Sequence, residues 1–194
     1  RGFPIGEDDS WEAIPYFAEL LDEVICQKNQ IHKNYILSWL AHLIQKPWDK
    51  PGVAIVLRSR EQGVGKGLFA NYIRHVIGKY NFCAINQREH LVGRFNSHYA
   101  NSIFIFADEA TSGYDRASIS VLKNLITEPT IRLEMKGKDT DEINSFHRIM
   151  MATNEDWSAP IELNDRRFFA LHVGTARLQD HNFFRGLNNE IING

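Results

Sequence analysis

The sequence is poor in cysteine and has no excess of either charge. Its two cysteines, Cys26 and Cys83, lie far apart, which excludes a disulfide framework and a cysteine-based metal cluster. We interpret both as small apolar core residues of a protein from a reducing compartment. The formal net charge of -2 excludes a global basic field. A nucleic-acid partner would therefore have to bind a local patch.

Long hydrophobic runs are absent as well. No apolar stretch approaches the roughly 20 residues that a membrane-spanning helix needs, and the N-terminus lacks the layout of a signal peptide. We therefore expect a cytoplasmic protein without a membrane partner, in the host cytoplasm if a phage encodes it. Because the chain begins with Arg1 rather than Met and ends in a segment with helical spacing, 182–192, we expect a piece of a longer protein.

The first 50 residues have the spacing of two packed helices. Apolar side chains recur on one face of each helix, first at Trp11, Ile14, Phe17, Leu20, Leu21, Val24 and Ile25, then at Tyr35, Ile36, Trp39, Leu40, Leu43 and Ile44. Residues 46–52 contain two prolines and a glycine, which is typical of a linker. The sequence therefore predicts a helical N-terminal unit over residues 1–50 and a core over residues 51–194.

The core alternates short apolar runs with helical patterns. Strands are predicted at residues 53–57, 82–85, 103–107, 149–152 and 168–173, and helices at residues 68–77 and 119–126. Buried strands that alternate with helices form a mostly parallel sheet covered on both faces. The predicted fold class is thus α/β, with a five-stranded sheet.

A glycine-rich loop between the first of these strands and the following helix is typical of a phosphate-binding P-loop. Glycines allow backbone N–H groups to surround phosphate oxygens, the helix N-terminus adds positive charge, and a lysine reaches the outer phosphates. Arg60 replaces the first glycine of the consensus, and Gly67 replaces a Ser or Thr that would bind magnesium. The predicted nucleotide-binding residues are Gln62, Gly63, Val64, Gly65, Lys66, Gly67 and Leu68.

Polar residues follow two other strands. Asp108 and Glu109 end the strand at 103–107, at the edge where α/β sheets bind ligands. We expect Asp108 to hold the magnesium shell, through water, and Glu109 to orient and deprotonate the attacking water. Asn154 follows the strand at 149–152 and is a candidate to contact the γ-phosphate or that water.

Two arginines, Arg166 and Arg167, precede the last strand. A guanidinium matches a planar phosphate and can act as an arginine finger, which stabilises charge on the transferred phosphoryl group. The alternative is a surface pair bonded to Asp165 or Glu162.

In this order, the motifs resemble those of the superfamily-three helicases of the AAA+ class, closest to the helicase domains of phage and plasmid primase-helicases and primase-polymerases. The motifs are residues 62–67, 108–110, 152–154 and 165–168, and the likeness extends from about residue 35 to 170. The resemblance implies an AAA+ P-loop core, ATP and Mg²⁺ as cofactors, and a hexameric ring in which Arg166 or Arg167 reaches a neighbour's nucleotide. It also implies an ATP-dependent replicative helicase that moves 3'-to-5' on single-stranded DNA, with a primase or polymerase domain on the same longer chain.

Residues 130–144 are two short runs around a Gly-containing turn, a pattern that predicts a hairpin with Lys136 and Lys138 near its tip. In the family that this chain resembles, a hairpin before the sensor strand carries a lysine that contacts DNA in the ring channel. We therefore expect Lys136 and Lys138 to bind the DNA backbone.

Two other functions are compatible with parts of the pattern. Gly65-Lys66-Gly67 also resembles the phosphate loop of adenylate-kinase-like enzymes, although Leu68 stands where those enzymes usually have Thr. The missing Ser or Thr at position 67 is compatible with a ring scaffold or loader that binds nucleotide without turnover.

Overall fold

The computed structural model describes residues 11–109, 114–134, 137, 139–154 and 165–193. Its centre is a five-stranded sheet in the order β2-β3-β6-β1-β7, in which all neighbouring strands are parallel. The strands are β1 (Ala54–Arg58), β2 (Phe82–Ile85), β3 (Phe104–Asp108), β6 (Arg148–Thr153) and β7 (Phe168–His172). The predicted α/β fold with a mostly parallel five-stranded sheet is therefore confirmed, and every predicted strand end lies within about one residue of the observed one.

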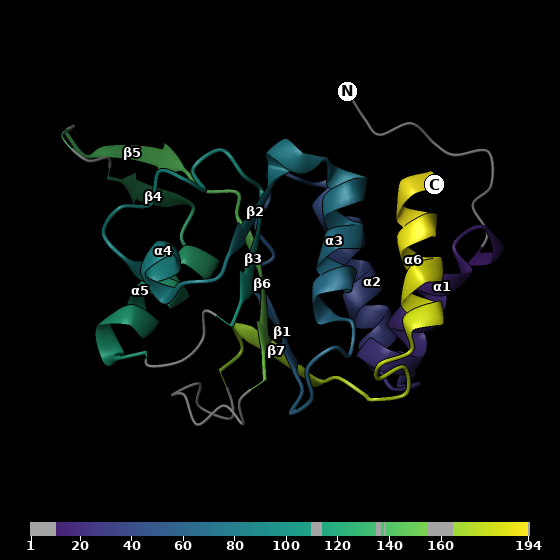
Figure 1. The fold of residues 1–194 in the computed structure, drawn as a ribbon. Helices are drawn as coiled ribbons and strands as arrows, with labels where there is room; N and C mark the ends of the chain where they lie inside the picture. Colours follow the sequence, from purple (N-terminus) through teal and green to yellow (C-terminus); the bar gives the residue numbers. More distant parts are fainter. Residues whose placement is uncertain (1–10, 110–113, 135–136, 138, 155–164, 194) are drawn as a thin grey trace.

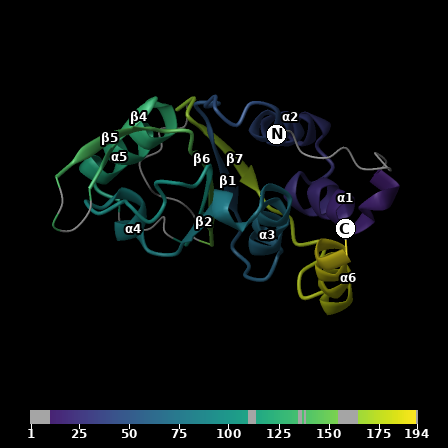
Figure 2. The same ribbon diagram turned by 90° about the horizontal axis from the view of Figure 1, so that it is seen from above.

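Helices cover both faces of this sheet, as Figures 1 and 2 show. One layer contains α1, α2, α3 and α6, and the opposite layer contains α4 and α5. Their bounds are α1 (Pro15–Glu19), α2 (Gln30–Gln45), α3 (Lys66–Ile77), α4 (Arg88–Val92), α5 (Arg116–Thr127) and α6 (His181–Asn193), and short 3-10 turns occupy Trp11–Ala13 and Lys79–Asn81. Among the described residues, no helix is both long and apolar enough to cross a membrane.

The side chains of each strand point alternately to the two faces of the sheet, which explains the two layers of helices. In β1, Ile55 and Leu57 pack into the core formed with α2 and α3, whereas Ala54 and Val56 pack into the core formed with α4 and α5. All of these side chains are fully buried. Because successive side chains of a strand point to opposite faces, a strand covered on both sides reads as a continuous apolar run.

The N-terminal segment differs in detail from two simple helices. Its first predicted helix is interrupted: α1 begins at Pro15, and a π-helix (Leu20–Ile25) continues it. Four side chains of the π-helix are buried, at Leu20, Leu21, Val24 and Ile25, and they share one core with β1 and α3. The second predicted helix is α2, whose first turn is capped by the Asn29 side chain, which accepts bonds from the Ile31 and His32 N–H groups.

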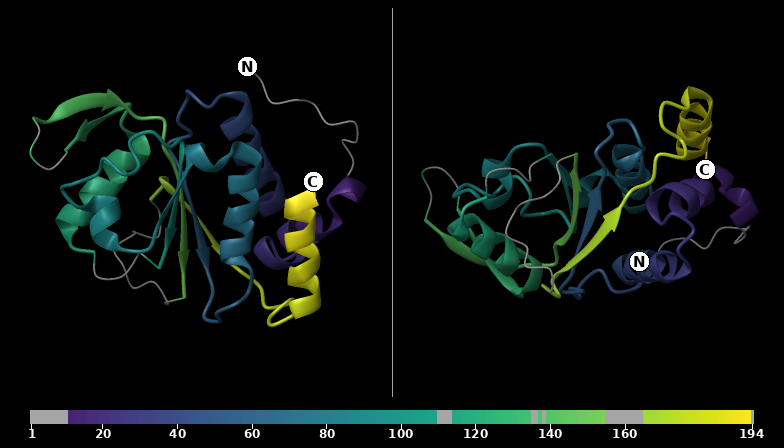
Figure 3. Two further views of the ribbon diagram at one scale, coloured as in Figure 1. Left: turned by 45° about the horizontal axis from the view of Figure 1, so that its top comes forward. Right: turned by 90° about the horizontal axis from the view of Figure 1, so that it is seen from below.

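The predicted hairpin is present as an antiparallel pair, β4 (Thr130–Leu133) and β5 (Asp141–Asn144). It lies on the side of the sheet that carries α4 and α5, away from α6 (Figures 1 and 3). The Asn96 side chain holds β4 through its amide, which donates to the Arg132 carbonyl at 2.7 Å and accepts from the Glu134 N–H at 3.0 Å. Lys136 and Lys138 lie outside the described residues.

Arg148 anchors the first residue of β6 to the end of α2. The residue is 1% exposed, and its guanidinium donates to the carbonyls of His42, Lys46 and Asp49 at 3.3, 2.7 and 2.5 Å. The cation therefore satisfies carbonyls at a helix C-terminus, where positive charge is favourable.

Replacing Arg148 with Met is expected to lower the free energy of unfolding by roughly 2–4 kcal/mol, because several partly buried carbonyls lose their donor. Chemical denaturation measures the difference, and Arg116→Met at an exposed position of α5 is the matched control. Equal stability of the two variants would contradict the anchoring role.

Candidate functional site

A glycine-rich loop (residues 59–65) joins the end of β1 to the start of α3. Gly63 and Gly65 have φ angles of 76° and 104°, in the left-handed region that glycine favours. A Cβ atom on Gly65 would lie 2.9 Å from Leu20 Cδ1 and 3.1 Å from Phe184 Cε1. Glycine is therefore required at position 65 by both the backbone conformation and the close packing.

Lys66 begins α3, and its side chain is directed toward the ends of neighbouring strands. It is 7% exposed, and its Nζ donates to Ser59 Oγ and, at 2.5 Å, to Asn154 Oδ1. Burial lowers the pKa of this ammonium, while Asp108 and Glu109 act in the opposite direction. The site thus holds a desolvated cation next to two carboxylates.

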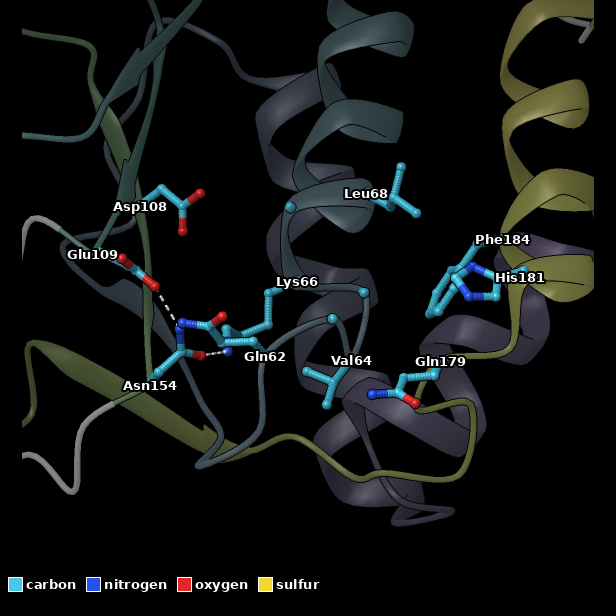
Figure 4. A pocket seen from close by; sticks show the side chains of 13 residues that line it. Gln62, Val64, Lys66, Leu68, Asp108, Glu109, Asn154, Gln179, His181 and Phe184 are labelled. Carbon is cyan, nitrogen blue, oxygen red and sulfur yellow. Dashed lines mark hydrogen bonds between the residues drawn. The ribbon is translucent and has the colours of Figure 1, made fainter.

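Asn154 connects this cation to Glu109. Its Nδ2 donates to Glu109 Oε1 at 2.5 Å while its Oδ1 accepts from Lys66. Glu109 has a φ of 55°, which is uncommon for a residue with a side chain, and such outliers cluster at functional sites. A chain of bonds therefore runs from Lys66 through Asn154 to Glu109 (Figure 4).

Asp108 is the last residue of β3 and contributes to the same site. Burial raises the pKa of its carboxyl, and the nearby Glu109 raises it further, whereas Lys66 lowers it. A carboxylate under these conditions is stabilised by an added cation.

These groups meet in one cavity of ≈ 730 Å³ at the carboxyl edge of the sheet. This is within the usual size range of small-molecule sites, and the edge is the usual location of ligands in parallel α/β sheets. The lining residues are Gln62, Gly63, Val64, Gly65, Lys66, Gly67, Leu68, Asp108, Glu109, Asn154, Gln179, His181 and Phe184. All seven residues predicted from the loop, and Asp108, Glu109 and Asn154, are thus brought together.

The two predicted arginines are not part of this cavity. They precede β7, and the Arg167 carbonyl accepts from the Ala54 N–H at the amino end of β1. A five-residue strand spans roughly 16 Å, so this end lies far from the glycine-rich loop. Arg167 Nη1 lies 3.3 Å from Asp165 Oδ1, as the alternative interpretation expected, while Arg166 is exposed.

Four residues of the site were not predicted from the sequence. Ser59 accepts the bond from Lys66, and Gln179, His181 and Phe184 form a wall of the cavity on the side of α6. Ser59 lies inside the glycine-rich loop, where its spacing from Lys66 offers a weak signal. The other three come from a segment more than 100 residues further along the chain that carries no motif.

Residues 57–167, more than half of the chain, match the family described as "Family of unknown function (DUF5906)". The chain belongs to this DUF5906 family. The matched range includes the glycine-rich loop, Asp108, Glu109 and Asn154, whereas Gln179, His181 and Phe184 lie beyond it.

Among individual proteins, this DUF5906 chain is 27% identical over 135 residues to a DNA primase-polymerase of Nitratiruptor phage NrS-1. The match covers 68% of the chain but only 18% of that phage protein. The fold is that of a part of the NrS-1 C-terminal region: an apo structure superposes with a TM-score of 0.78 at 22% identity, over 98% of this chain and 46% of the other. A second apo structure of that region gives a TM-score of 0.77.

Proposed function

We propose that this chain is the ATP-hydrolysing motor of a superfamily-three helicase of the AAA+ class, acting on single-stranded DNA in phage or plasmid replication. The observation that carries this proposal is the bonded chain from Lys66 through Asn154 to Glu109, with Asp108 in the same cavity. A cation, a polar group that orients water and carboxylates for the metal shell and for water activation are among the groups that enzymes use for phosphoryl transfer to water.

The glycine-rich loop acts as the P-loop in this proposal. Its N–H groups and the N-terminus of α3 bind the phosphates. The Lys66 ammonium exchanges its bond with Asn154 for a bond with the outer phosphate oxygens. Asn154 is then free to orient the attacking water, while Glu109 accepts its proton. The products are ADP and inorganic phosphate, and the proton on Glu109 returns to solvent.

The donor set fits a magnesium ion held mainly by the nucleotide. Magnesium often keeps several waters and is bound mainly by phosphate oxygens, so Asp108 can hold the ion through its water shell although Gly67 supplies no ligand. The raised pKa of the Asp108 carboxyl agrees with a group suited to a cation. When bound, the ion would neutralise charge that develops on the phosphate oxygens.

The distance between the arginines and the cavity supports a site shared between subunits. None of the described residues that line the cavity is an arginine. A ring in which Arg166 or Arg167 of one subunit reaches the cavity of the next would supply the missing positive charge. The proposed assembly is therefore a homo-oligomeric ring, most simply a hexamer.

β6 offers a direct link from the nucleotide to DNA. The hairpin returns into the amino end of β6, and Asn154 follows its carboxyl end. All six residues of this strand are buried, so it is a tightly packed element between the two sites. We propose that contacts of Asn154 with the nucleotide shift the hairpin and its two lysines along DNA.

The relatives agree with a role in replication. The NrS-1 protein is a DNA primase-polymerase, and this chain is similar to a part of it. A primase or polymerase domain elsewhere on the same longer chain is part of the proposal.

Strand separation tests the helicase function. With a forked DNA duplex that carries a 3' single-stranded tail, the protein should release the displaced strand with ATP and Mg²⁺, and should not do so with ADP. Stimulation of ATP turnover by single-stranded DNA is the second expected result. An ATP hydrolysis rate that is the same with and without single-stranded DNA, together with no release of the displaced strand, would contradict the helicase role.

A non-catalytic scaffold is the second candidate, because Gly67 removes the usual metal-binding hydroxyl. It predicts that ATP drives assembly of the ring without release of phosphate. Solution mass and phosphate release, measured on one sample, distinguish the two functions.

Replacing Lys136 and Lys138 together with Ala is expected to weaken binding of single-stranded DNA at low salt. Each lost phosphate contact should make the slope of log K against log salt shallower by about 0.7. A DNA titration at several salt concentrations measures both effects. Lys28→Ala with Lys46→Ala, at exposed positions outside the hairpin, makes the same change in charge. Equal affinity of the two double variants would exclude the hairpin as the DNA contact.

A further inference from the structure

The cavity has two chemically different ends. Lys66, Asp108, Glu109 and Asn154 form a charged and polar end. At the other end, Gln179, His181 and Phe184 come from the start of α6 and the turn before it. Figure 4 shows the two groups on opposite sides of the glycine-rich loop, with the carboxylates on the β3 side and the aromatic rings beside α6. The proposed phosphate chemistry uses only the first group.

The Phe184 ring forms a half-buried wall next to the phosphate loop. A Cβ atom on Gly65 would lie 3.1 Å from its Cε1 atom, so the ring packs against the backbone of the glycine-rich loop. The neighbouring Phe183 ring is buried and meets Phe184 edge to face, with centroids 5.4 Å apart. Phe184 is thus held in place while it still lines the cavity.

Gln179 adopts a conformation that needs an explanation. Its φ is 58°, and the Gln179 carbonyl accepts from the His181 N–H at 2.9 Å, which closes a tight turn. A residue with a side chain in the left-handed region costs stability, and such residues cluster at ligand sites. The amide carries both a donor and an acceptor. Because Gln179 is exposed and lines the cavity, both are available to a ligand.

Several contacts fix this wall to the rest of the fold. The Asp180 carboxylate caps α6 by accepting from the Phe183 N–H at 3.0 Å. Arg177 pairs with Asp180 at 3.1 Å and with Glu19 of α1, and its guanidinium lies 5.0 Å from the Phe183 ring centroid. The turn is therefore held in one position relative to α1.

We propose that Gln179, His181 and Phe184 form the subsite for the purine base of the nucleotide. The base stacks on Phe184 beside His181, and the Gln179 amide bonds to its polar edge. Stacking on an aromatic ring accepts any base, whereas an amide with a donor and an acceptor distinguishes one base edge from another. The inference rests on the proposed function, because it takes the nucleotide phosphates to lie at Lys66.

Phe184→Ala tests the stacking. Its affinity for ATP should fall about tenfold, because base stacking on one aromatic side chain has effects of this size. Its affinity for inorganic tripolyphosphate, which has no base, should equal that of the wild type. Phe95→Ala, at an exposed aromatic position outside the cavity, is the matched control. Unchanged ATP affinity, or an equal loss of ATP and tripolyphosphate affinity, would overturn the subsite.

Gln179→Gly tests whether the Gln179 amide recognises the edge of the base. The substitution does not disturb the turn, since glycine adopts the same φ freely. The wild type should bind ATP and GTP with different affinities, and the variant should reduce that difference several-fold while its tripolyphosphate affinity is unchanged. The same discrimination in both proteins would exclude Gln179 as the recognising group.

These results are distinguishable from failure of the proposed function. If the wild type binds neither ATP nor tripolyphosphate more tightly than Lys66→Ala does, the phosphate site itself is wrong. If the wild type binds both and the Phe184 and Gln179 variants match it, only the base subsite is wrong.

Discussion

Replacing Glu109 with Gln should lower the rate of ATP hydrolysis by a factor on the order of 10² to 10⁴, the usual contribution of a general base. Gln has almost the shape of Glu, and its carbonyl oxygen can still accept the bond from Asn154 Nδ2. An amide does not accept a proton from water at neutral pH, however. We therefore expect ATP affinity to be retained while phosphate release falls by this factor, as measured by equilibrium binding and a phosphate assay on the same preparation.

Glu89→Gln is the control for this prediction. Glu89 is an exposed carboxylate of α4 outside the cavity, and its replacement makes the same change in charge. If Glu109→Gln and Glu89→Gln hydrolyse ATP at the same rate, Glu109 is not the base, whatever its geometry suggests.

Lys66→Ala should lower the affinity for ATP by roughly 10- to 150-fold, the range for loss of a charged hydrogen bond. The buried ammonium of Lys66 already lies among groups that hold it in place, so little ordering is needed when a phosphate replaces Asn154 as its partner. Titration with ATP, and separately with ADP, measures the loss, which should be larger for ATP if Lys66 contacts the outer phosphate.

Lys46→Ala removes an exposed lysine at the end of α2 and serves as the control. The thermal unfolding midpoint of each variant shows whether the fold is intact. If a folded Lys66→Ala protein binds ATP as tightly as Lys46→Ala does, the glycine-rich loop is not the phosphate-binding site.

The sheet was predictable because its three central strands, β1, β3 and β6, are buried on both faces. Runs such as 53–57 and 103–107 are continuously apolar, short and bounded by turn residues, and few other structures satisfy such a pattern. The turn from β1 into α3 was predictable for a similar reason, because its glycines indicate a particular local backbone conformation. Local patterns therefore predicted the sheet and the polar ends of its strands.

Other features depend on tertiary contacts and had no local signal. The π-helix at Leu20–Ile25 buries four apolar side chains, a result that ordinary helical spacing does not distinguish from an α-helix. The five-residue α4 was not predicted either, because Arg88–Val92 contains only a single buried side chain, Leu91. Short elements of this kind are determined by what they pack against.

The candidate site also has a part that the sequence predicted and a part that it did not. The order of motifs indicated that Lys66, Asp108, Glu109 and Asn154 belong together, but not that Asn154 bridges Lys66 and Glu109. The wall formed by residues 179–184 was missed because its contact with Gly65 arises only when α6 folds back beside α3. Side chains from distant segments meet for reasons that only the packed core supplies.

ATP turnover is the most direct test of the central claim that this cavity hydrolyses ATP. Phosphate release should be measured for the wild type and Glu109→Gln over a range of protein concentrations, with Mg²⁺, with and without single-stranded DNA, alongside mass in solution. We predict release by the wild type alone, rising more steeply than protein concentration as a ring assembles and increased by DNA. Equal phosphate release by the two proteins at every concentration, including those at which a ring has formed, would contradict it.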